Sequence, residues 1–147
     1  MSYTNLLYHI VFATKERAPL IIAELRPLLH EYLGGTARGL GGAALAVGGI
    51  ADHVHLMVKI KPTIAVSEFI KQLKANSSGW ANKQTRGRFA WQSRYGAFSV
   101  SESQIEKVRA YILRQEEHHR RVPFEEEFKA LLLAHRIEFD ERYLWTT

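Results

Sequence analysis

The sequence predicts an α+β fold of the ferredoxin-like type, in which a βαββαβ order forms an antiparallel sheet and helices are added at the C-terminus. Four strand-like runs rich in β-branched and aromatic residues alternate with two amphipathic stretches in this order, and further helical stretches follow. The chain has 147 residues and no visible linker, repeat or low-complexity segment. Residues 1–147 are therefore expected to form one domain.

The first strand and the first helix are expected in the N-terminal quarter of the chain. Leu6 to Ala13 is rich in β-branched and aromatic residues and predicts a strand. A helix is expected to begin at Pro19, to be kinked by Pro27 and to end at the pair Gly34–Gly35. Its helical spacing comes from the apolar residues Ile22, Leu25, Leu28, Leu29 and Tyr32.

A hairpin and a second helix are expected next. Ala43 to Ile50 and His53 to Ile60 are strand-like runs joined by the short Ala51–Asp52 turn. Pro62 ends the second run, and Val66 to about Lys83 predicts an amphipathic helix.

The C-terminal part predicts a last strand region and more helices. Phe89 to Val100 alternates bulky and small residues, which predicts one bent strand or two short ones. A third long helix is expected to begin at Ser101 and end near His119, and a short helix from Pro123 through Ala134. The remaining tail, Ile137 to Trp145, is aromatic and acidic.

Composition limits the classes of function. The chain has no cysteine, which excludes disulfides and thiolate metal sites and favours a cytoplasmic location. Its net charge of +5 favours a polyanionic partner, because neutralised phosphates release counterions. The N-terminus lacks the basic region of a signal peptide, and Gly39 to Ala51, the longest weakly polar run, is too short to span a bilayer. No membrane association is expected.

His53-Val54-His55 is the first candidate constellation. Residues two apart on a strand point to the same face, so both imidazoles project together and can hold one divalent cation. Taken alone, the motif is better explained as a chance pair, one member of which sits at a strand edge. Asp52 is a candidate third ligand or hydrogen-bond acceptor for a histidine, or an ordinary turn residue.

Tyr111 and Gln115 form the second constellation. They are four apart on a predicted helix and share one face of it. A phenol can attack phosphorus as a nucleophile, and a carboxamide oxygen suits Mg²⁺ or Mn²⁺. The alternative is that Tyr111 packs on the sheet while Gln115 is solvated.

Together the two constellations resemble the HUH superfamily of single-strand endonucleases, in which two histidines flank a hydrophobic residue. Tyr111 followed by Gln115 is similar to the small single-tyrosine transposases of bacterial and archaeal insertion sequences, including the REP-associated tyrosine transposases. Three segments that also resemble the family are Tyr8 to Lys15, Ala51 to Leu56 and Trp91 to Phe98. The resemblance extends from Tyr3 to about Trp145.

This resemblance implies a metal-dependent transposase that cleaves and rejoins single-stranded DNA at hairpin-marked ends. Tyr111 would be the nucleophile that forms a 5′-phosphotyrosine, and His53, His55 and Gln115 would hold Mg²⁺ or Mn²⁺. No nucleotide cofactor is needed, because the phosphotyrosine conserves the bond energy. The family also implies a homodimer, to which the apolar run Ala43 to Ile50 would contribute if it is not simply core.

Basic residues outside these constellations are candidates for DNA contacts, although solvated helix faces give the same pattern. They are Lys15, Arg17, Lys71, Lys74, Lys83, Arg86 and Arg88. His118 lies near the Tyr111 stripe and is a candidate alternative ligand or phosphate contact, but a solvated helix end explains it better. His9 is expected to be buried and hydrogen-bonded.

Three other classes of function compete with an active transposase. The first is a non-catalytic nucleic-acid-binding module with a ferredoxin-like sheet, which would need neither metal nor Tyr111. The second is a relaxase with the same chemistry, but those proteins are usually larger. The third is an HUH endonuclease domesticated for a host role, which has the same sequence features.

Overall fold

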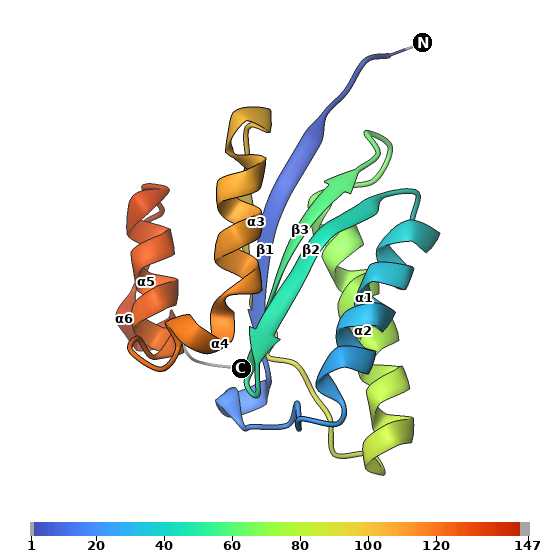
Figure 1. Ribbon diagram of the computed structural model, residues 1–147, viewed down its shortest axis with the longest axis vertical. Helices are drawn as coiled ribbons and strands as arrows, with labels where there is room; N and C mark the ends of the chain where they lie inside the picture. The colour runs from blue at the N-terminus through green and yellow to red at the C-terminus, as the bar shows by residue number, and fades with distance from the viewer. Residues whose placement is uncertain (1, 145–147) are drawn as a thin grey trace.

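A computed structural model describes residues 2–144 and has the predicted α+β fold (Figure 1). Its sheet has four strands in the order β2-β3-β1-β4, with every neighbouring pair antiparallel. This is the strand order of a ferredoxin-like βαββαβ fold, which confirms the predicted class. The strands are β1 Leu6–Ala13, β2 Ala43–Ile50, β3 His53–Ile60 and β4 Gly96–Ser99.

Helices cover both faces of the sheet (Figure 1). Those on one face are α1 Arg26–Gly39 and α2 Val66–Thr85. Those on the side of the other face are α3 Ile105–Leu113, α4 Gln115–His118, α5 Phe124–Ala134 and α6 Glu141–Leu144. Two 3₁₀ turns, η1 Lys15–Arg17 and η2 Glu102–Gln104, complete the described elements. Trp145, at the end of the predicted aromatic tail, lies outside the described residues.

The larger apolar cluster lies between the sheet and helices α1 and α2. Val54 of β3, Leu33 of α1 and Phe69 of α2 are fully buried within it. Since side chains alternate along β3, Val54 faces this cluster while its neighbours His53 and His55 face the opposite helices. The alternation thus separates the packing face of β3 from the face that carries the histidines.

The predicted limits of the first helix are wrong. The helix begins at Arg26 rather than Pro19, and Pro27 lies in its first turn, where no backbone N–H is needed. Gly34 and Gly35 lie inside the helix, which continues to Gly39. Packing of the buried face against β2 therefore outweighs the weak helix propensity of the two glycines.

The region from Phe89 onwards also differs from the predictions in two details. The predicted long third helix is broken at Arg114, whose φ of −104° and ψ of 22° separate α3 from α4. The sequence predicts one bent strand or two short ones over Phe89 to Val100. The structure has one isolated bridge, at Trp91, and the short strand β4 in this range. The predicted helix after Pro123 is confirmed as α5.

Candidate active site

The two histidines of β3 lie at the centre of the site. His53 and His55 have no exposed surface and project from the same face of the strand. Their ring centroids are 5.1 Å apart. The alternation predicted from the sequence therefore holds, and it brings two imidazoles to one buried point beneath α4 and α5.

A hydrogen bond on the outer nitrogen orients each of three imidazoles in the site. His53 Nδ1 lies 2.7 Å from Asp52 Oδ1, and His119 Nδ1 lies 2.6 Å from the carbonyl oxygen of Val122. His55 Nδ1 lies 2.8 Å from Nε2 of His9. These contacts turn all three Nε2 atoms inward, as in histidines that bind metals. Asp52 thus contacts a histidine rather than the centre, and His9 is buried and hydrogen-bonded as expected.

Tyr111 and Gln115 lie over the histidines and on the same side of the chain, the shared face that their spacing predicted. The Tyr111 ring is 5.7 Å from the His55 ring, and its hydroxyl donates a hydrogen bond to Glu127 Oε2. Gln115 is 1% exposed, and its Oε1 lies 3.1 Å from His53 Nε2. The structure therefore brings all four predicted site residues together within one chain.

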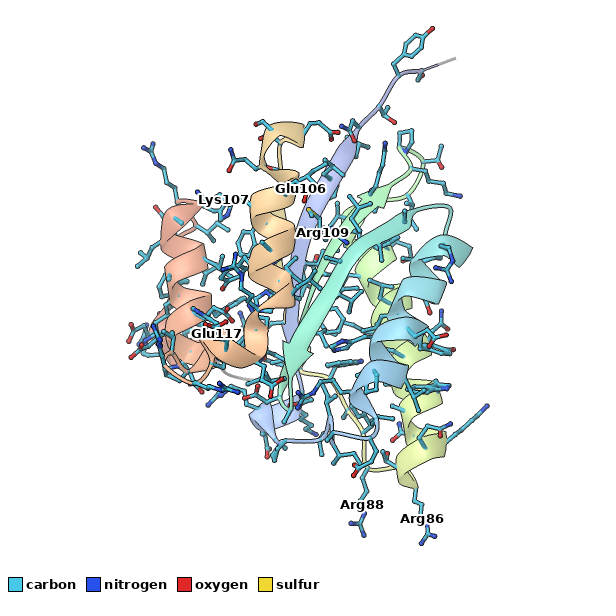
Figure 2. All side chains as sticks on the ribbon, in the orientation of Figure 1. Arg86, Arg88, Glu106, Lys107, Arg109 and Glu117 are labelled. Carbon is cyan, nitrogen blue, oxygen red and sulfur yellow. The ribbon has the colours of Figure 1, made fainter. Side chains whose placement is uncertain are left out.

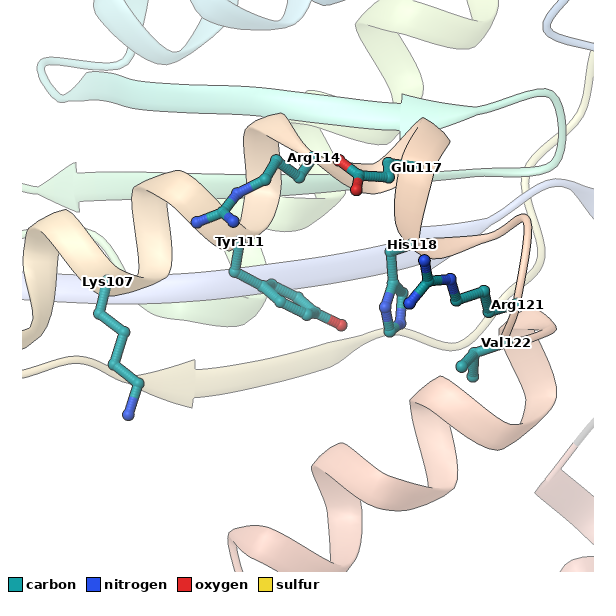
Figure 3. A pocket seen from close by; sticks show the side chains of 7 residues that line it. All are labelled: Lys107, Tyr111, Arg114, Glu117, His118, Arg121 and Val122. Carbon is teal, nitrogen blue, oxygen red and sulfur yellow. The ribbon is translucent and has the colours of Figure 1, made fainter.

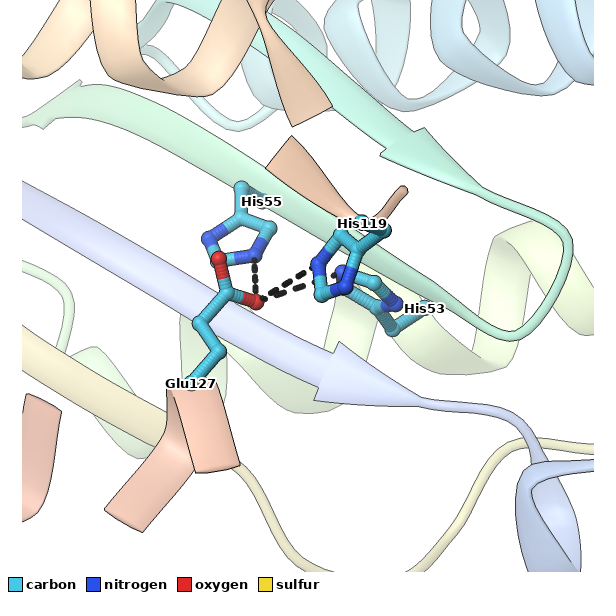
Figure 4. Close-up of side chains that lie close together, drawn as sticks. All are labelled: His53, His55, His119 and Glu127. Atoms are coloured by element: carbon cyan, nitrogen blue, oxygen red, sulfur yellow. Dashed lines mark hydrogen bonds and ion pairs between the residues drawn. The ribbon is translucent and has the colours of Figure 1, made fainter. Parts of the chain in front are cut away.

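Two further residues complete this cluster and were not predicted from the sequence. His119 Nε2 lies 3.0 Å from Glu127 Oε1, and the same oxygen is 2.9 Å from His55 Nε2 (Figure 4). His119 follows Gln115 by four residues, which is a spacing that could have indicated it. Glu127 gives no such signal, because it is one of three consecutive glutamates and only its burial, at 3% exposed, distinguishes it.

The buried side chains of the site have pKa values that are shifted in different directions. Burial disfavours ionised Glu127, but hydrogen bonds from His119, His53 and His55 outweigh it and hold the carboxyl pKa well below its usual range. Burial likewise opposes a charged His53, yet bonds to Asp52 and Glu127 raise its pKa to about 9. For His55 burial prevails and lowers the pKa to about 4. Burial and the adjacent Glu127 carboxylate raise the pKa of Tyr111.

The chemistry of the donors fits a divalent cation. His53, His55, His119 and Glu127 each offer one ligand atom, and these four atoms lie within 4.8 Å of one another. Imidazole nitrogens and carboxylate oxygens are both common ligands of divalent metals. Gln115 Oε1 lies beside them, 2.9 Å from His119 Nε2.

A cavity of about 400 Å³ lies on the outer side of Tyr111 (Figure 3). Its lining residues are Lys107, Tyr111, Arg114, Glu117, His118, Arg121 and Val122. Three of these side chains are cationic and one is anionic, so the cavity suits an anion such as a phosphodiester. His118 is thus part of the cavity wall and lies 3.3 Å from Glu127 Oε2.

The basic residues predicted to contact DNA lie apart from this cavity. Lys71, Lys74 and Lys83 are on α2, which covers the opposite face of the sheet. Arg86 and Arg88 extend beyond the end of α2, away from α3 (Figure 2). The structure therefore does not bring these five residues to Tyr111.

Two of the residues predicted to contact DNA, Lys74 and Arg17, interact with other groups of the chain. Lys74 donates hydrogen bonds to the carbonyl oxygens of Gln92, at 2.5 Å, and Arg94, at 3.2 Å. Burial lowers the pKa of Lys74 to about 8. Arg17 forms an ion pair with Glu125 at the start of α5, and Lys15 is exposed on the same 3₁₀ turn. The cationic residues nearest the tyrosine are instead those of the cavity, which sequence reasoning did not single out.

Fold and site together define an α+β domain that carries a tyrosine helix over a buried histidine pair. Comparison with known sequences gives the family. The sequence model described as "Transposase IS200 like" matches residues 2–115, so the chain belongs to the IS200-like transposase family. The match includes His53, His55, Tyr111 and Gln115 and ends before His119.

Individual relatives agree with this assignment. The chain is 30% identical over 118 residues to the transposase for insertion sequence element IS200 of Salmonella typhimurium, covering 76% of this chain and 77% of that protein. It is 26% identical over 115 residues to the ISDra2 transposase TnpA of Deinococcus radiodurans, covering 74% and 82% respectively.

Two solved structures are also similar. A Deinococcus radiodurans R1 protein assigned as a transposase has a TM-score of 0.64 and 26% identity, covering 76% of this chain and 91% of that chain. A REP-associated tyrosine transposase, solved with a bound REP hairpin, has a TM-score of 0.56 and 13% identity, covering 76% and 67%. The second likeness is one of fold. Among residues 2–144, no helix is long and apolar enough to cross a membrane.

Proposed function

We propose that this protein is an active transposase that cleaves and rejoins single-stranded DNA through a 5′-phosphotyrosine on Tyr111. The observation that carries the proposal is the position of the Tyr111 hydroxyl. It lies between a buried histidine group and a cationic cavity, and Glu127 Oε2 accepts its hydrogen bond. A phenol in this position can meet a phosphodiester that the cations of the cavity hold.

His53, His55 and Gln115 would hold the divalent cation, as Mg²⁺ or Mn²⁺. A bound divalent ion would polarise the scissile phosphate and offset its developing charge. The donors that face the site fit this role, because the outer nitrogens of both histidines are already occupied by Asp52 and His9.

The remaining chemistry belongs to residues of the chain. The Tyr111 oxygen attacks phosphorus, a bond to that oxygen forms, and the bond from phosphorus to the 3′ oxygen breaks. The phenolic proton leaves through Glu127 Oε2, the atom that already accepts its hydrogen bond, and is delivered to the departing 3′ oxygen. Because the pKa of the Glu127 carboxyl is low and that of Tyr111 is raised, a bound divalent cation would be needed to favour deprotonation of the phenol. A later 3′-hydroxyl attacks the phosphotyrosine and reverses these changes, which joins the strand without a nucleotide cofactor.

The DNA path in this proposal crosses the cavity beside α3. Lys107, Arg114 and Arg121 would contact phosphates on either side of the scissile bond. A DNA hairpin is the substrate expected at the element ends, and the REP-associated neighbour, solved with a hairpin, supports this choice. The predicted contacts on α2 would then be reached only by DNA that extends around the domain.

A homodimer remains part of the proposal through family resemblance. The side chains of β2 pack within the chain, since Ala46 lies in one apolar cluster and Val47 packs against another. The edge of β2 that faces away from β3 is the surface that a second copy would pair with. The residues of the proposed site lie together within one chain.

Covalent trapping tests the proposed reaction. Wild-type protein and Tyr111→Phe are incubated with end-labelled single-stranded DNA hairpins, with Mg²⁺ or Mn²⁺ and separately with a chelator. A protein–DNA adduct on a denaturing gel that needs both the metal and Tyr111 is expected. Hairpin binding without any adduct would favour a non-catalytic binding module or a domesticated protein, and an adduct of the Phe variant would assign the nucleophile elsewhere.

A further inference from the structure

We propose that His119 and Glu127 are metal ligands, so that the site is a three-histidine, one-carboxylate centre that prefers a transition-metal ion such as Mn²⁺ over Mg²⁺. This inference rests on the proposed function, because it concerns the same centre. It adds two ligands from the C-terminal segment to the pair on β3, and it changes the class of cation that the protein would select.

The first argument is the convergence of the four side chains on one point. Glu127 Oε1 lies 2.9 Å from His55 Nε2, 3.0 Å from His119 Nε2 and 3.5 Å from His53 Nε2. These side chains come from β3, from the turn after α4 and from α5 (Figure 4). The three imidazoles direct the same nitrogen at one carboxylate oxygen, and the four ligand atoms lie within 4.8 Å of one another.

The second argument comes from the outer nitrogens. The acceptors on Nδ1 of His53 and His119 are a carboxylate oxygen and a carbonyl oxygen, neither of which can donate a proton. Each Nδ1 therefore carries a hydrogen, and Nε2 is the atom of each ring that is left to face the Glu127 carboxylate. In the metal-free site these nitrogens donate hydrogen bonds to Glu127, and a bound divalent cation would take the place of those hydrogens, since a metal ligand must be deprotonated.

The four side chains are buried, unlike those of a surface ion-pair network. His53 and His55 are completely buried, Glu127 is 3% exposed and the His119 side chain is 4% exposed. Buried charged groups are costly unless they are paired or bind a metal. Phe124 covers the group from α5, with its ring 4.4 Å from the His53 ring.

The donor set determines the class of cation. Mg²⁺ favours oxygen ligands in an octahedral arrangement and keeps several waters. Three imidazole nitrogens instead suit Mn²⁺, Fe²⁺, Co²⁺ or Zn²⁺, with affinity that rises along this series of softer ions. Gln115 Oε1, 3.1 Å from His53 Nε2, adds a second oxygen beside the carboxylate.

The two added ligands lie beyond the part of the chain that the family model matches, which ends at residue 115. The pair His53 and His55 together with Gln115 lies inside the matched part. The proposal therefore separates a ligand set expected for the family from an extension that depends on the C-terminal segment of this chain.

Metal binding to the full-length, chelator-stripped chain tests the inference without any DNA. We expect calorimetry and Mn²⁺ electron paramagnetic resonance to show one Mn²⁺ per chain, with Mg²⁺ bound at least about tenfold more weakly. His119→Gln and Glu127→Gln should each weaken Mn²⁺ binding at least about tenfold. Glu126→Gln, next to Glu127, and His135→Gln, at the exposed C-terminal end of α5, serve as matched controls and should leave it unchanged.

The outcomes distinguish this inference from the proposed function. No metal binding by the wild-type chain would overturn both. Binding that His53→Gln abolishes, but that His119→Gln and Glu127→Gln leave at wild-type affinity without preference for Mn²⁺, would overturn only the inference. Equal weakening by the control substitutions would also overturn it, because the effect would then be one of general charge. If circular dichroism shows that a variant is unfolded, the wild-type preference between Mn²⁺ and Mg²⁺ decides.

Discussion

Gly48 determines how closely the tyrosine helix approaches the sheet, and Gly48→Ala tests this contact. A Cβ on Gly48 would lie 2.0 Å from the carbonyl oxygen of Ile112 and 3.1 Å from its Cγ2. Gly48 pairs with His55 across β2 and β3, and Ile112 directly follows Tyr111. The substitution therefore acts on the separation between the tyrosine and the histidine strand.

The magnitude follows from this geometry. The contacted atom belongs to the backbone of α3 and has no rotamer by which to move aside. Restoring an ordinary contact of at least about 3.0 Å requires a displacement of about 1 Å, and overpacking of this kind costs about 1–3 kcal/mol of unfolding free energy. A misplacement of about 1 Å in a reacting group lowers a rate about 100-fold.

Urea denaturation and the initial rate of adduct formation measure the two effects. Gly79→Ala is the matched control, because a Cβ at this exposed position of α2 meets nothing within 4 Å. It should stabilise the chain by about 0.5–1 kcal/mol and leave the rate unchanged. If Gly48→Ala shows the wild-type midpoint and the wild-type rate, the close approach of α3 does not position Tyr111 and the reasoning fails.

Three other predictions concern single side chains. Burial lowers the pKa of His30 to about 4. Its contribution to stability is therefore present above about pH 6.5 and is lost as the pH falls toward 4. In urea denaturation, His30→Leu should lose less stability than the wild type across this pH range. Lys74→Met should cost about 1–3 kcal/mol in thermal or urea unfolding, because two carbonyl oxygens lose their donor, while hairpin affinity stays at the wild-type value. Arg114→Gln should reduce the slope of log affinity against log salt by about 1 in hairpin-binding titrations, whereas Arg86→Gln, away from the cavity, should not.

Local periodicity accounts for what the sequence predicted well. His53 and His55 share a strand face because side chains alternate, and Tyr111 and Gln115 remain close although Arg114 breaks the helix between them. Both relations depend on residues that are close together in the sequence. The order of the four strands followed in the same way from runs whose apolar pattern was strong.

The failures share a different cause, which is packing between distant elements. The first helix continues through Gly34 because its face packs on β2, and no local signal shows this. Glu127 belongs to a run of three similar glutamates, and only the docking of α5 selects it for burial. Lys74 was predicted to contact DNA from its charge, but the chain folds its ammonium group onto carbonyl oxygens near β4.

The position of Glu127 links the two parts of the proposed site through one side chain. Its Oε1 faces the imidazole nitrogens, while its Oε2 accepts hydrogen bonds from the Tyr111 hydroxyl and, at 3.1 Å, from Gln115 Nε2. An ion bound at Oε1 would leave the hydrogen bond at Oε2 in place, so the metal and the tyrosine can contact the same carboxylate without competing. Because Glu127 reaches the site only when Phe124 and Phe128 of α5 pack against the sheet, docking of this helix would control both the metal affinity and the position of the tyrosine. The C-terminal helix is therefore part of the chemistry in this proposal, and not only a cover for the sheet.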